Sequence, residues 1–359
     1  MPGSEGNGVP GASAIIDTDA VVIGAGPVGL YQVFQLGLLG ARAHVIDALP
    51  RAGGQPAEFY PDKPIYDLPG LLACTGQQLT DTLLAQIAPF EPVLHFGQEA
   101  QTLHRLPDGR WEIGTRGTHA PGGELALRAR ALFIAAGAGA FAPKRLKLPG
   151  IEAWEERQLF YRPPAAGLPG NRVLIIGGDQ TALACAIGLA ESGRHAVTLV
   201  HRREKFQADE DIVARWHALQ SQGRARFVAG QPTGFEAEGE RLAALRVADH
   251  EGRDCRLALD TVIVLQGLSP QLGPIAKWGL ALERKQLAVD PERFATRAPG
   301  IFAVGDVNTY PGKKKLLICG FHEAVLASWG AWPTLFPDQP EPPLLYTSSN
   351  AHLKALLGR

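Results

Sequence analysis

The fold is decided by the stretch Ala20–Gly29, which reads AVVIGAGPVG. Its first four residues form a short apolar run, which is typical of a buried parallel strand. Glycines follow directly with the spacing G-x-G-x-x-G, and an apolar helical pattern then continues to Leu38 and stops at Gly40. The sequence therefore predicts a strand, a tight turn and a helix, in the order that opens a βαβ unit.

The residues of this turn suit the binding of a dinucleotide. Gly24 permits the tight turn after the strand, and Gly26 lets the backbone approach a pyrophosphate closely. Pro27 suits the first turn of the helix, where free N–H groups and the helix dipole attract phosphates. Asp47 follows the next strand, Ala43–Ile46, where a carboxylate can accept hydrogen bonds from a ribose. We interpret these four residues as a dinucleotide site; a purely structural turn is the alternative.

A second unit repeats this order in the middle of the chain. The strand Arg172–Ile176 is followed by a turn containing Gly177 and by a helical pattern over Gln180–Glu191. Asp179 stands where the second glycine of the pattern is expected, and an anionic side chain there would hinder a pyrophosphate. Two such units predict two nucleotide-binding domains, with Gly177 and Thr181 as contacts of the second nucleotide.

The next strand of the second unit has a basic end. Ala196–Val200 is followed by His201, Arg202 and Arg203. Guanidinium groups form strong hydrogen bonds with phosphates, so Arg202 and Arg203 favour the 2′-phosphate of NADP(H) over NAD(H). A solvated basic strand end is the alternative interpretation.

Composition excludes several other classes of function. The chain has 359 residues, enough for two or three domains, and 35 Lys plus Arg against 36 Asp plus Glu argue against non-specific nucleic-acid binding. Its four cysteines contain no C-x-x-C, which excludes a dithiol of neighbouring cysteines and a cysteine-based zinc site. Residues 1–13 are rich in Gly, Pro and Ser, which predicts a disordered tail, and no apolar run reaches the length of a membrane span. We therefore expect a soluble cytoplasmic protein without a metal site.

Four further segments are not explained by a generic nucleotide-binding unit. They are Asp47–Gln55, Tyr60–Asp67, Gly300–Asp306 and Gly320–Ala324. Together they resemble the two-domain flavoprotein reductases, most closely the ferredoxin–NADP reductases of the thioredoxin-reductase-like type, over about residues 17–359. Thioredoxin reductases carry a C-x-x-C ahead of the second glycine turn, whereas the matching segment Leu159–Gly167 has no cysteine. The resemblance therefore implies that electrons pass from a flavin directly to an external acceptor.

The resemblance also implies which residues contact the flavin cofactor, FAD. Tyr60 would stack on the isoalloxazine ring, Asp306 would bind the ribityl or pyrophosphate region, and Tyr346 would cover the opposite face of the flavin, usually from the partner subunit. No classical catalytic residue is required, because the cofactor supplies the reactive atoms. The remaining positions that match family contacts are Gln55, Ala100, Phe141 and Thr347.

The sequence thus predicts an α/β fold with two Rossmann-like nucleotide-binding domains. A discontinuous FAD domain would cover 14–140 and 260–359, and an inserted NADP domain would cover 141–259. The implied activity of the homodimer is hydride transfer between NADPH and FAD, followed by one-electron transfer to a ferredoxin or flavodoxin.

Two alternative functions remain open. One is an NAD(P)H-dependent reductase of a quinone, an iron chelate or a small disulfide. The other is a flavoprotein with impaired NADPH binding, suggested by Asp179 and by Gln207, where relatives often have arginine.

Two basic segments are candidates for docking a protein partner. The loop Pro311–Lys315 carries three consecutive lysines, which near the flavin could dock an acidic ferredoxin and raise the association rate. A solvated loop is the alternative. Lys144, Arg145 and Lys147 allow the same two interpretations.

Overall fold

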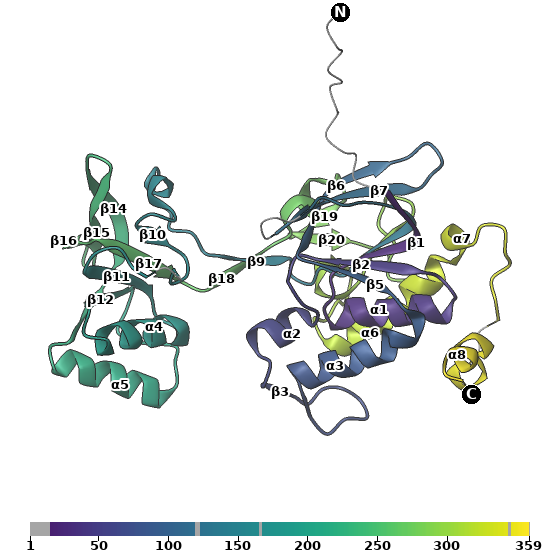
Figure 1. The fold of residues 1–359 in the computed structure, drawn as a ribbon, viewed down its shortest axis with the longest axis horizontal. Helices are drawn as coiled ribbons and strands as arrows, with labels where there is room; N and C mark the ends of the chain where they lie inside the picture. Colours follow the sequence, from purple (N-terminus) through teal and green to yellow (C-terminus); the bar gives the residue numbers. More distant parts are fainter. Residues whose placement is uncertain (1–14, 119–122, 165–166, 344–345, 359) are drawn as a thin grey trace, which may run out of the picture. The chain divides into compact units, whose positions relative to one another are not determined.

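The structure, a computed structural model, describes residues 15–118, 123–164, 167–343 and 346–358 (Figure 1). The tail expected over 1–13 lies outside the described residues. The chain forms two compact units, one made of Met1–Ala140 with Gln271–Arg359 and the other of Phe141–Pro270. Two strands that pair with each other, β9 (Ala140–Pro143) and β18 (Leu268–Gln271), connect the units.

A seven-stranded sheet forms the middle of the first unit. Its strands run in the order β5-β2-β1-β8-β7-β6, and β21 also pairs with β8. The pairs β7–β8 and β6–β7 are antiparallel, and all other pairs are parallel, so the carboxyl ends of β1, β2, β8 and β21 lie at one edge. The bounds are β1 (Ile15–Ile23), β2 (Ala43–Asp47), β5 (Val93–Phe96), β6 (Gln98–Arg105), β7 (Trp111–Gly117), β8 (Ala126–Ile134) and β21 (Ile301–Ala303).

Three helices, α1 (Pro27–Leu38), α3 (Gly76–Ile87) and α6 (Leu317–Gly330), cover one face of this sheet (Figure 1). Their apolar side chains share a core with Phe133 and Phe302 of the sheet, and the other face of the sheet buries a second core. The smaller elements of the unit are α2 (Gly54–Phe59), β3 (Pro64–Ile65), β4 (Cys74–Thr75), β19 (Leu282–Glu283), β20 (Gln286–Ala288), β22 (Asn308–Thr309), α7 (Trp332–Leu335) and α8 (Ala351–Leu356).

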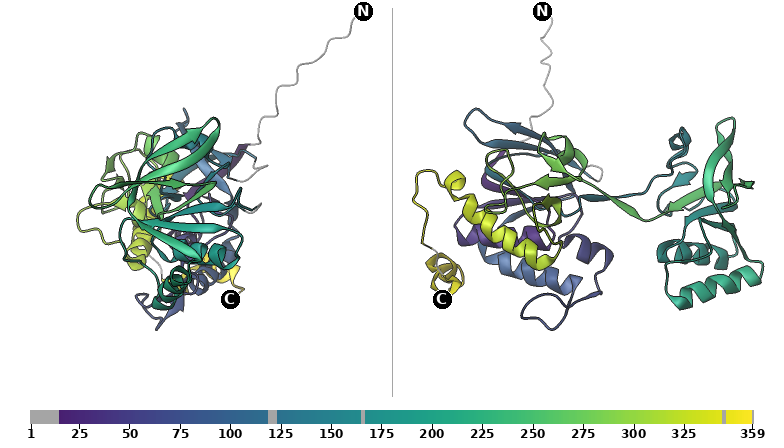
Figure 2. Two further views of the ribbon diagram at one scale, coloured as in Figure 1. Left: turned by 90° about the vertical axis from the view of Figure 1, so that its left-hand side faces the viewer. Right: turned by 180° about the vertical axis from the view of Figure 1, so that it is seen from behind.

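The second unit is built on a five-stranded parallel sheet with the order β10-β17-β11-β12-β13. Its strands are β10 (Leu159–Phe160), β11 (Arg172–Gly177), β12 (Ala196–His201), β13 (Ala225–Ala229) and β17 (Thr261–Leu265). Two helices pack on one face of this sheet, and an antiparallel three-stranded sheet shares the core of the other face (Figure 2). These elements are α4 (Gln180–Glu191), α5 (Glu210–Ser221), β14 (Gln231–Glu238), β15 (Arg241–Ala248) and β16 (Asp254–Ala258).

The second crossing between the units lies later in the chain than the sequence suggested. A boundary at 259/260 would remove β17 from the second unit, but Val173 of β11 pairs with Thr261, and Ile176 pairs with Val264. The β17 residues Thr261–Val264 are buried between their neighbours. Residues up to Pro270 therefore belong to the second unit.

Candidate cofactor-binding site

The first glycine turn lies at the carboxyl ends of β1 and β8, and its backbone requires glycine at two positions. Gly24 has φ +110°, and a Cβ there would lie 2.4 Å from the carbonyl oxygen of Ala135. A Cβ on Gly29 would lie 1.8 Å from the Gly24 carbonyl oxygen, so this glycine permits the helix to pack against the turn. At Gly26 the nearest atom to a Cβ would be the Gly54 Cα at 3.8 Å. The Gly26 backbone is therefore open enough for a ligand to approach.

The N-terminus of α1 suits an anionic ligand. Gly26 is the N-cap, Pro27 is the first helical residue, and no side chain of the described residues caps the first turn. The Leu30 N–H already bonds the Gly26 carbonyl at 2.9 Å. The N–H groups nearer the helix start, together with the helix dipole, form the kind of site that binds phosphate.

Asp47, expected to bind a ribose, also organises the glycine turn. Its Oδ2 accepts the Ala25 N–H at 2.6 Å, and its Oδ1 accepts the Leu49 N–H at 2.8 Å. Burial raises the pKa of the Asp47 carboxyl, and the two backbone hydrogen bonds oppose this shift. The carboxylate thus ties the end of β2 to the turn after β1, a role that the sequence did not predict.

A second pair of glycines places Gln55 at the same edge of the sheet. Gly53 has φ +113°, and a Cβ on Gly54 would lie 2.9 Å from the Gly26 Cα, so the start of α2 packs closely on the first turn. The Gln55 amide nitrogen lies 3.3 Å from the position of a Cβ on Gly137, in the turn after β8. Tyr60 follows α2 and is 58% exposed, which leaves its ring accessible to a ligand.

Asp306 joins this group from the far end of the sequence. It lies in a short 3₁₀ helix, Gly305–Val307, directly after β21. A Cβ on Gly305 would lie 3.4 Å from Val28, so this segment packs against the first turn of α1. The Asp306 carboxylate is half-buried and forms no hydrogen bond or ion pair with a described residue. The structure therefore brings together Gly24, Gly26, Pro27, Asp47, Gln55 and Asp306 at one edge of the sheet.

The four other candidate residues of the first site have different surroundings. Ala100 is buried in the second core with 5% exposure, and the side chain of Phe141 lies outside the described residues. Tyr346 is 85% exposed and Thr347 begins the next short helix. Asn350 then donates a hydrogen bond to the Leu38 carbonyl at 3.1 Å, at the opposite end of α1. Since a twelve-residue helix spans about 18 Å, Asn350 lies far from the glycine turn of its own chain.

The second glycine turn differs from the first at the helix N-terminus. Asp179 is the N-cap of α4, and its carboxylate accepts the Ala182 N–H at 3.0 Å. Gly177 must be glycine, because a Cβ would lie 2.2 Å from the Leu265 carbonyl oxygen. The ring of His201 covers Gly178, where a Cβ would lie 2.5 Å from three ring atoms. An anionic side chain thus already occupies the place expected for a pyrophosphate.

The end of β12 presents free cationic groups. Arg202 and Arg203 are exposed, and neither forms a hydrogen bond or ion pair with a described residue. Burial, and then the charges of these two arginines, lower the pKa of His201, and the charge of Asp179 opposes this shift. Thr181 is exposed in the first turn of α4. These groups fit a phosphate ester at the strand end.

The lysine loop differs from its expected exposure. Lys314 and Lys315 are exposed, but the Lys313 side chain is only 7% exposed and forms an ion pair with Glu323 of α6, so the expectation of an exposed lysine is wrong at Lys313. Glu323 was not among the residues that the sequence singled out. A signal was present, because Glu323 is the one acidic residue in the mostly apolar stretch Leu316–Gly330.

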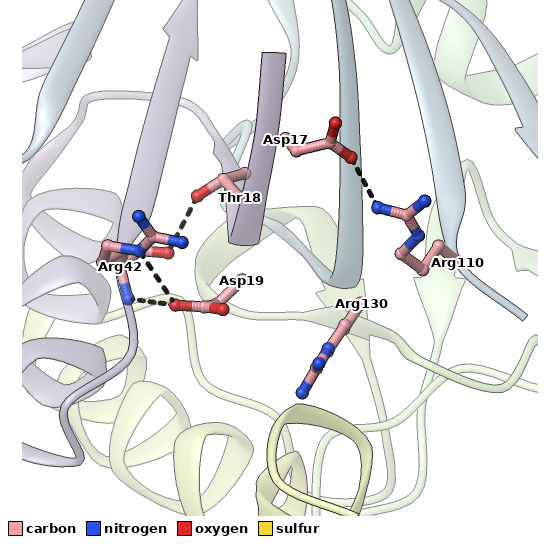
Figure 3. A pocket seen from close by; sticks show the side chains of 6 residues that line it. All are labelled: Asp17, Thr18, Asp19, Arg42, Arg110 and Arg130. Atoms are coloured by element: carbon pink, nitrogen blue, oxygen red, sulfur yellow. Dashed lines mark hydrogen bonds and ion pairs between the residues drawn. The ribbon is translucent and has the colours of Figure 1, made fainter. Parts of the chain in front are cut away.

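A surface hollow of about 250 Å³ lies at the other end of β1, away from the glycine turn (Figure 3). Arg110 pairs with Asp17 at 2.5 Å, Arg42 contacts Asp19 at 3.5 Å, and Arg130 donates to a backbone carbonyl at 2.6 Å. Most of the charged groups in this hollow are therefore already paired with one another.

Among the residues that the structure describes, no group of three His, Cys, Asp or Glu side chains is placed to hold a metal ion. No helix in the described part of the chain has the length and apolar character needed to cross a bilayer.

Comparison with known families identifies the chain. The model of the pyridine nucleotide-disulphide oxidoreductase family matches residues 73–329. The chain belongs to this family. The family name refers to a disulphide, yet all four cysteines of this member are free and lie far apart in the sequence. This oxidoreductase therefore has no neighbouring dithiol.

Two relatives that match nearly the whole chain are named ferredoxin–NADP reductase. The chain is 50% identical over 354 residues to the ferredoxin–NADP reductase of Paracidovorax citrulli, covering 96% of this chain and 97% of the relative. It is 51% identical over 346 residues to the ferredoxin–NADP reductase of an Acidovorax species, covering 95% of each. The resemblance inferred from the motifs is therefore confirmed.

Solved structures of other oxidoreductases share the fold. The bacillithiol disulfide reductase of Staphylococcus aureus matches with a TM-score of 0.60 and 14% identity, over 90% of this chain and 100% of that structure. The thioredoxin reductase of T. acidophilum matches with a TM-score of 0.55 and 22% identity, over 88% and 98%. The predicted α/β class with two Rossmann-like domains is confirmed.

Proposed function

We propose that the protein is an FAD-dependent ferredoxin–NADP reductase. The observation that carries the proposal is its similarity, over nearly the whole length, to enzymes of that name. The free, widely spaced cysteines support a route that bypasses a dithiol. When bound, FAD would supply a centre that takes a hydride from NADPH and returns electrons singly to a ferredoxin or flavodoxin.

The first unit fits FAD. The uncapped N-terminus of α1 binds the pyrophosphate through N–H groups, and Gly26 provides the close backbone approach. Asp47 holds the turn and offers its remaining lone pairs to the adenosine ribose. Asp306, whose carboxylate has no partner among the described residues, orients the ribityl chain, and Tyr60 shields the ring from water.

In the second unit, the end of β12 suits the 2′-phosphate of NADPH, whereas the N-terminus of α4 suits its pyrophosphate less well. Arg202 and Arg203 are exposed and form no ion pairs within the described residues, so their guanidinium groups are available to a ligand. In this proposal they bind the 2′-phosphate. Asp179 already accepts a hydrogen bond at the α4 N-terminus, so the pyrophosphate must displace a carboxylate of like charge. This observation favours a second candidate function, a flavoprotein with weak NADPH binding that takes its electrons from another donor.

We further propose that the enzyme is a cytoplasmic homodimer. Tyr346 is 85% exposed, and Asn350, four residues further on, bonds the end of α1 opposite the glycine turn, which supports donation of Tyr346 and Thr347 to the flavin of the partner subunit. Ala100 and Phe141 complete the cofactor contacts as backbone and packing positions.

Anaerobic titration of the purified yellow protein tests these functions. Prompt bleaching of the flavin absorbance by NADPH, followed by cytochrome c reduction that requires added ferredoxin, is the expected result. Bleaching with cytochrome c reduction independent of ferredoxin would indicate a reductase of another acceptor. A yellow protein that neither NADPH nor NADH bleaches at saturation would favour the second candidate. A protein that stays colourless after incubation with FAD would end the proposal.

A further inference from the structure

A buried ion pair lies beneath the loop that carries Asp306. The Lys313 ammonium contacts the Glu323 carboxylate at 2.5 Å, with the Lys313 side chain 7% exposed and the Glu323 side chain fully buried. Removing two charges from water is unfavourable unless their geometry is good and their other hydrogen-bonding groups are satisfied. A pair buried this deeply depends on the hydrogen bonds that surround it.

Glu323 gathers four donors from one short loop. Its Oε2 accepts the Gly305 N–H at 2.7 Å and the Asn308 side-chain amide at 2.9 Å. Its Oε1 accepts the Tyr310 hydroxyl at 3.0 Å as well as the Lys313 ammonium. All four donors lie between residues 305 and 313, so the loop is folded around this single carboxylate.

Gly305 is fixed through both of its peptide groups. Besides the N–H bond to Glu323, its carbonyl accepts a hydrogen bond from the Lys313 ammonium at 2.9 Å. Its φ is +78°, and it packs so closely on the first turn of α1 that a Cβ there would lie 3.4 Å from Val28. Asp306 follows directly, with its carboxylate unpartnered within the described residues. The ion pair thus determines where that carboxylate lies relative to the helix N-terminus.

We propose that Glu323 and Lys313 are positioning residues for the flavin: through Gly305 they set the Asp306 carboxylate beside the α1 N-terminus without touching the cofactor. The inference rests on the proposed FAD binding. It assigns the conformation of the 305–313 loop to a buried charge pair rather than to contacts made by the cofactor. The proposal therefore predicts that the loop keeps this conformation in the apoprotein.

The double variant Glu323→Gln with Lys313→Met tests the proposal, because it removes both charges together and leaves no unpaired charge buried. The FAD dissociation constant of the apoprotein is measured by quenching of flavin fluorescence, and folding is checked by circular dichroism and Tm. We expect a folded apoprotein that binds FAD at least tenfold more weakly, with an altered visible circular dichroism spectrum of the bound flavin.

The matched control is the ion pair of Glu112 and Arg128, which contact at 2.7 Å in the same unit and are both partly exposed. Glu112→Gln with Arg128→Met leaves the FAD dissociation constant within twofold of wild type. Tyr310→Phe removes one donor to Glu323 and keeps the ring against Phe294, 5.3 Å away. This milder variant shifts the flavin midpoint potential and weakens FAD binding two- to threefold.

The outcomes separate this inference from the proposed function. Wild-type protein that binds FAD, together with folded double and Tyr310→Phe variants that match its dissociation constant, spectrum and potential, overturns the positioning role alone. If the double variant does not fold, Tyr310→Phe decides the matter. Wild-type apoprotein that fails to bind FAD overturns the proposed function, and the positioning role with it.

Discussion

The Asp179 carboxylate accepts the N–H of Ala182 at 3.0 Å and thereby caps its own helix. At the corresponding position of the first unit, Gly26 leaves the start of α1 without a side-chain cap among the described residues. A carboxylate and a pyrophosphate both favour the N–H groups and the positive dipole at a helix start. Two units of similar sequence order therefore differ at the very atoms that would bind phosphate.

Replacing Asp179 with glycine is expected to tighten NADPH binding about fivefold, because about 1 kcal/mol is typical of one charge at a helix N-terminus. Stability should fall by only a few tenths of a kcal/mol, because glycine is an acceptable N-cap. Isothermal titration of the variant and wild type with NADPH measures the difference.

The matched control is Asp209→Gly, at the N-cap of α5, where the described residues show no hydrogen bond from the helix to the Asp209 side chain. NADPH affinity should not change in this variant. An unchanged or weaker affinity in Asp179→Gly would show that Asp179 does not lie at the pyrophosphate.

Arg202→Ala with Arg203→Ala should weaken NADPH binding far more than NADH binding. Hydrogen bonds to charged groups contribute roughly 1.5–3 kcal/mol each, so the loss for NADPH should be on the order of tenfold or more. NADH lacks the 2′-phosphate and should lose little. Stopped-flow flavin reduction at varied NADPH and NADH concentrations gives the two dissociation constants, with Arg194→Ala as an exposed arginine control in the same unit. Equal losses for the two nucleotides would rule out a 2′-phosphate role.

The first site could be predicted from the sequence because its signals are local. The strand, the glycine turn and the helix start at Pro27 are contiguous, and a backbone that needs φ +110° at Gly24 leaves the residue type little freedom. Asp306 was found through the resemblance, and the structure explains its place by the parallel pairing of β21 with β8. Sequence patterns of this kind predict the fold and the edge of the sheet where the candidate residues gather.

The parts that sequence reasoning missed depend on contacts between distant residues. Lys313 is buried because it pairs with Glu323 of α6. The sequence alone does not show which of three consecutive lysines forms such a pair. The domain boundary was placed too early because β17 is an apolar strand that could belong to either sheet; its pairing with β11 decides. The role of Tyr346 at a partner's flavin stays a prediction, because a single chain does not test it.

Lys314 and Lys315 remain as the exposed part of the lysine loop, next to the exposed apolar side chains of Leu316 and Ile318. Lys314→Glu with Lys315→Glu should slow ferredoxin-dependent cytochrome c reduction roughly tenfold at low salt, because steering of an acidic partner is lost. The difference should shrink as ionic strength rises. NADPH-dependent flavin bleaching should be unchanged, and Lys277→Glu serves as a control for an exposed lysine elsewhere in the unit. If the rate of ferredoxin-dependent cytochrome c reduction changes neither in this variant nor with ionic strength, the partner docks on another surface.

We expect His44 and His95 to make the stability of the first unit depend on pH. Their Nδ1 and Nε2 atoms lie 2.9 Å apart on β2 and β5, with the rings stacked. Burial lowers the pKa of both imidazoles, and the neighbouring charge of His95 and then that of Arg42 lower the pKa of His44 further. The unfolded chain therefore binds protons at higher pH than the folded chain does.

This contribution to stability is present above about pH 6.5 and is lost as the pH falls below that value. We expect the Tm of the wild type to decrease between pH 7.5 and pH 5 more steeply than the Tm of His44→Gln with His95→Gln, which has no imidazole to charge at either position. His250→Gln, at an exposed histidine of the other unit, should keep the wild-type slope. Thermal unfolding followed by circular dichroism at several pH values gives the three slopes. If Tm falls with pH equally steeply in the wild type and the double variant, acid destabilises the protein through other groups. The histidine pair then does not contribute to the pH dependence of folding.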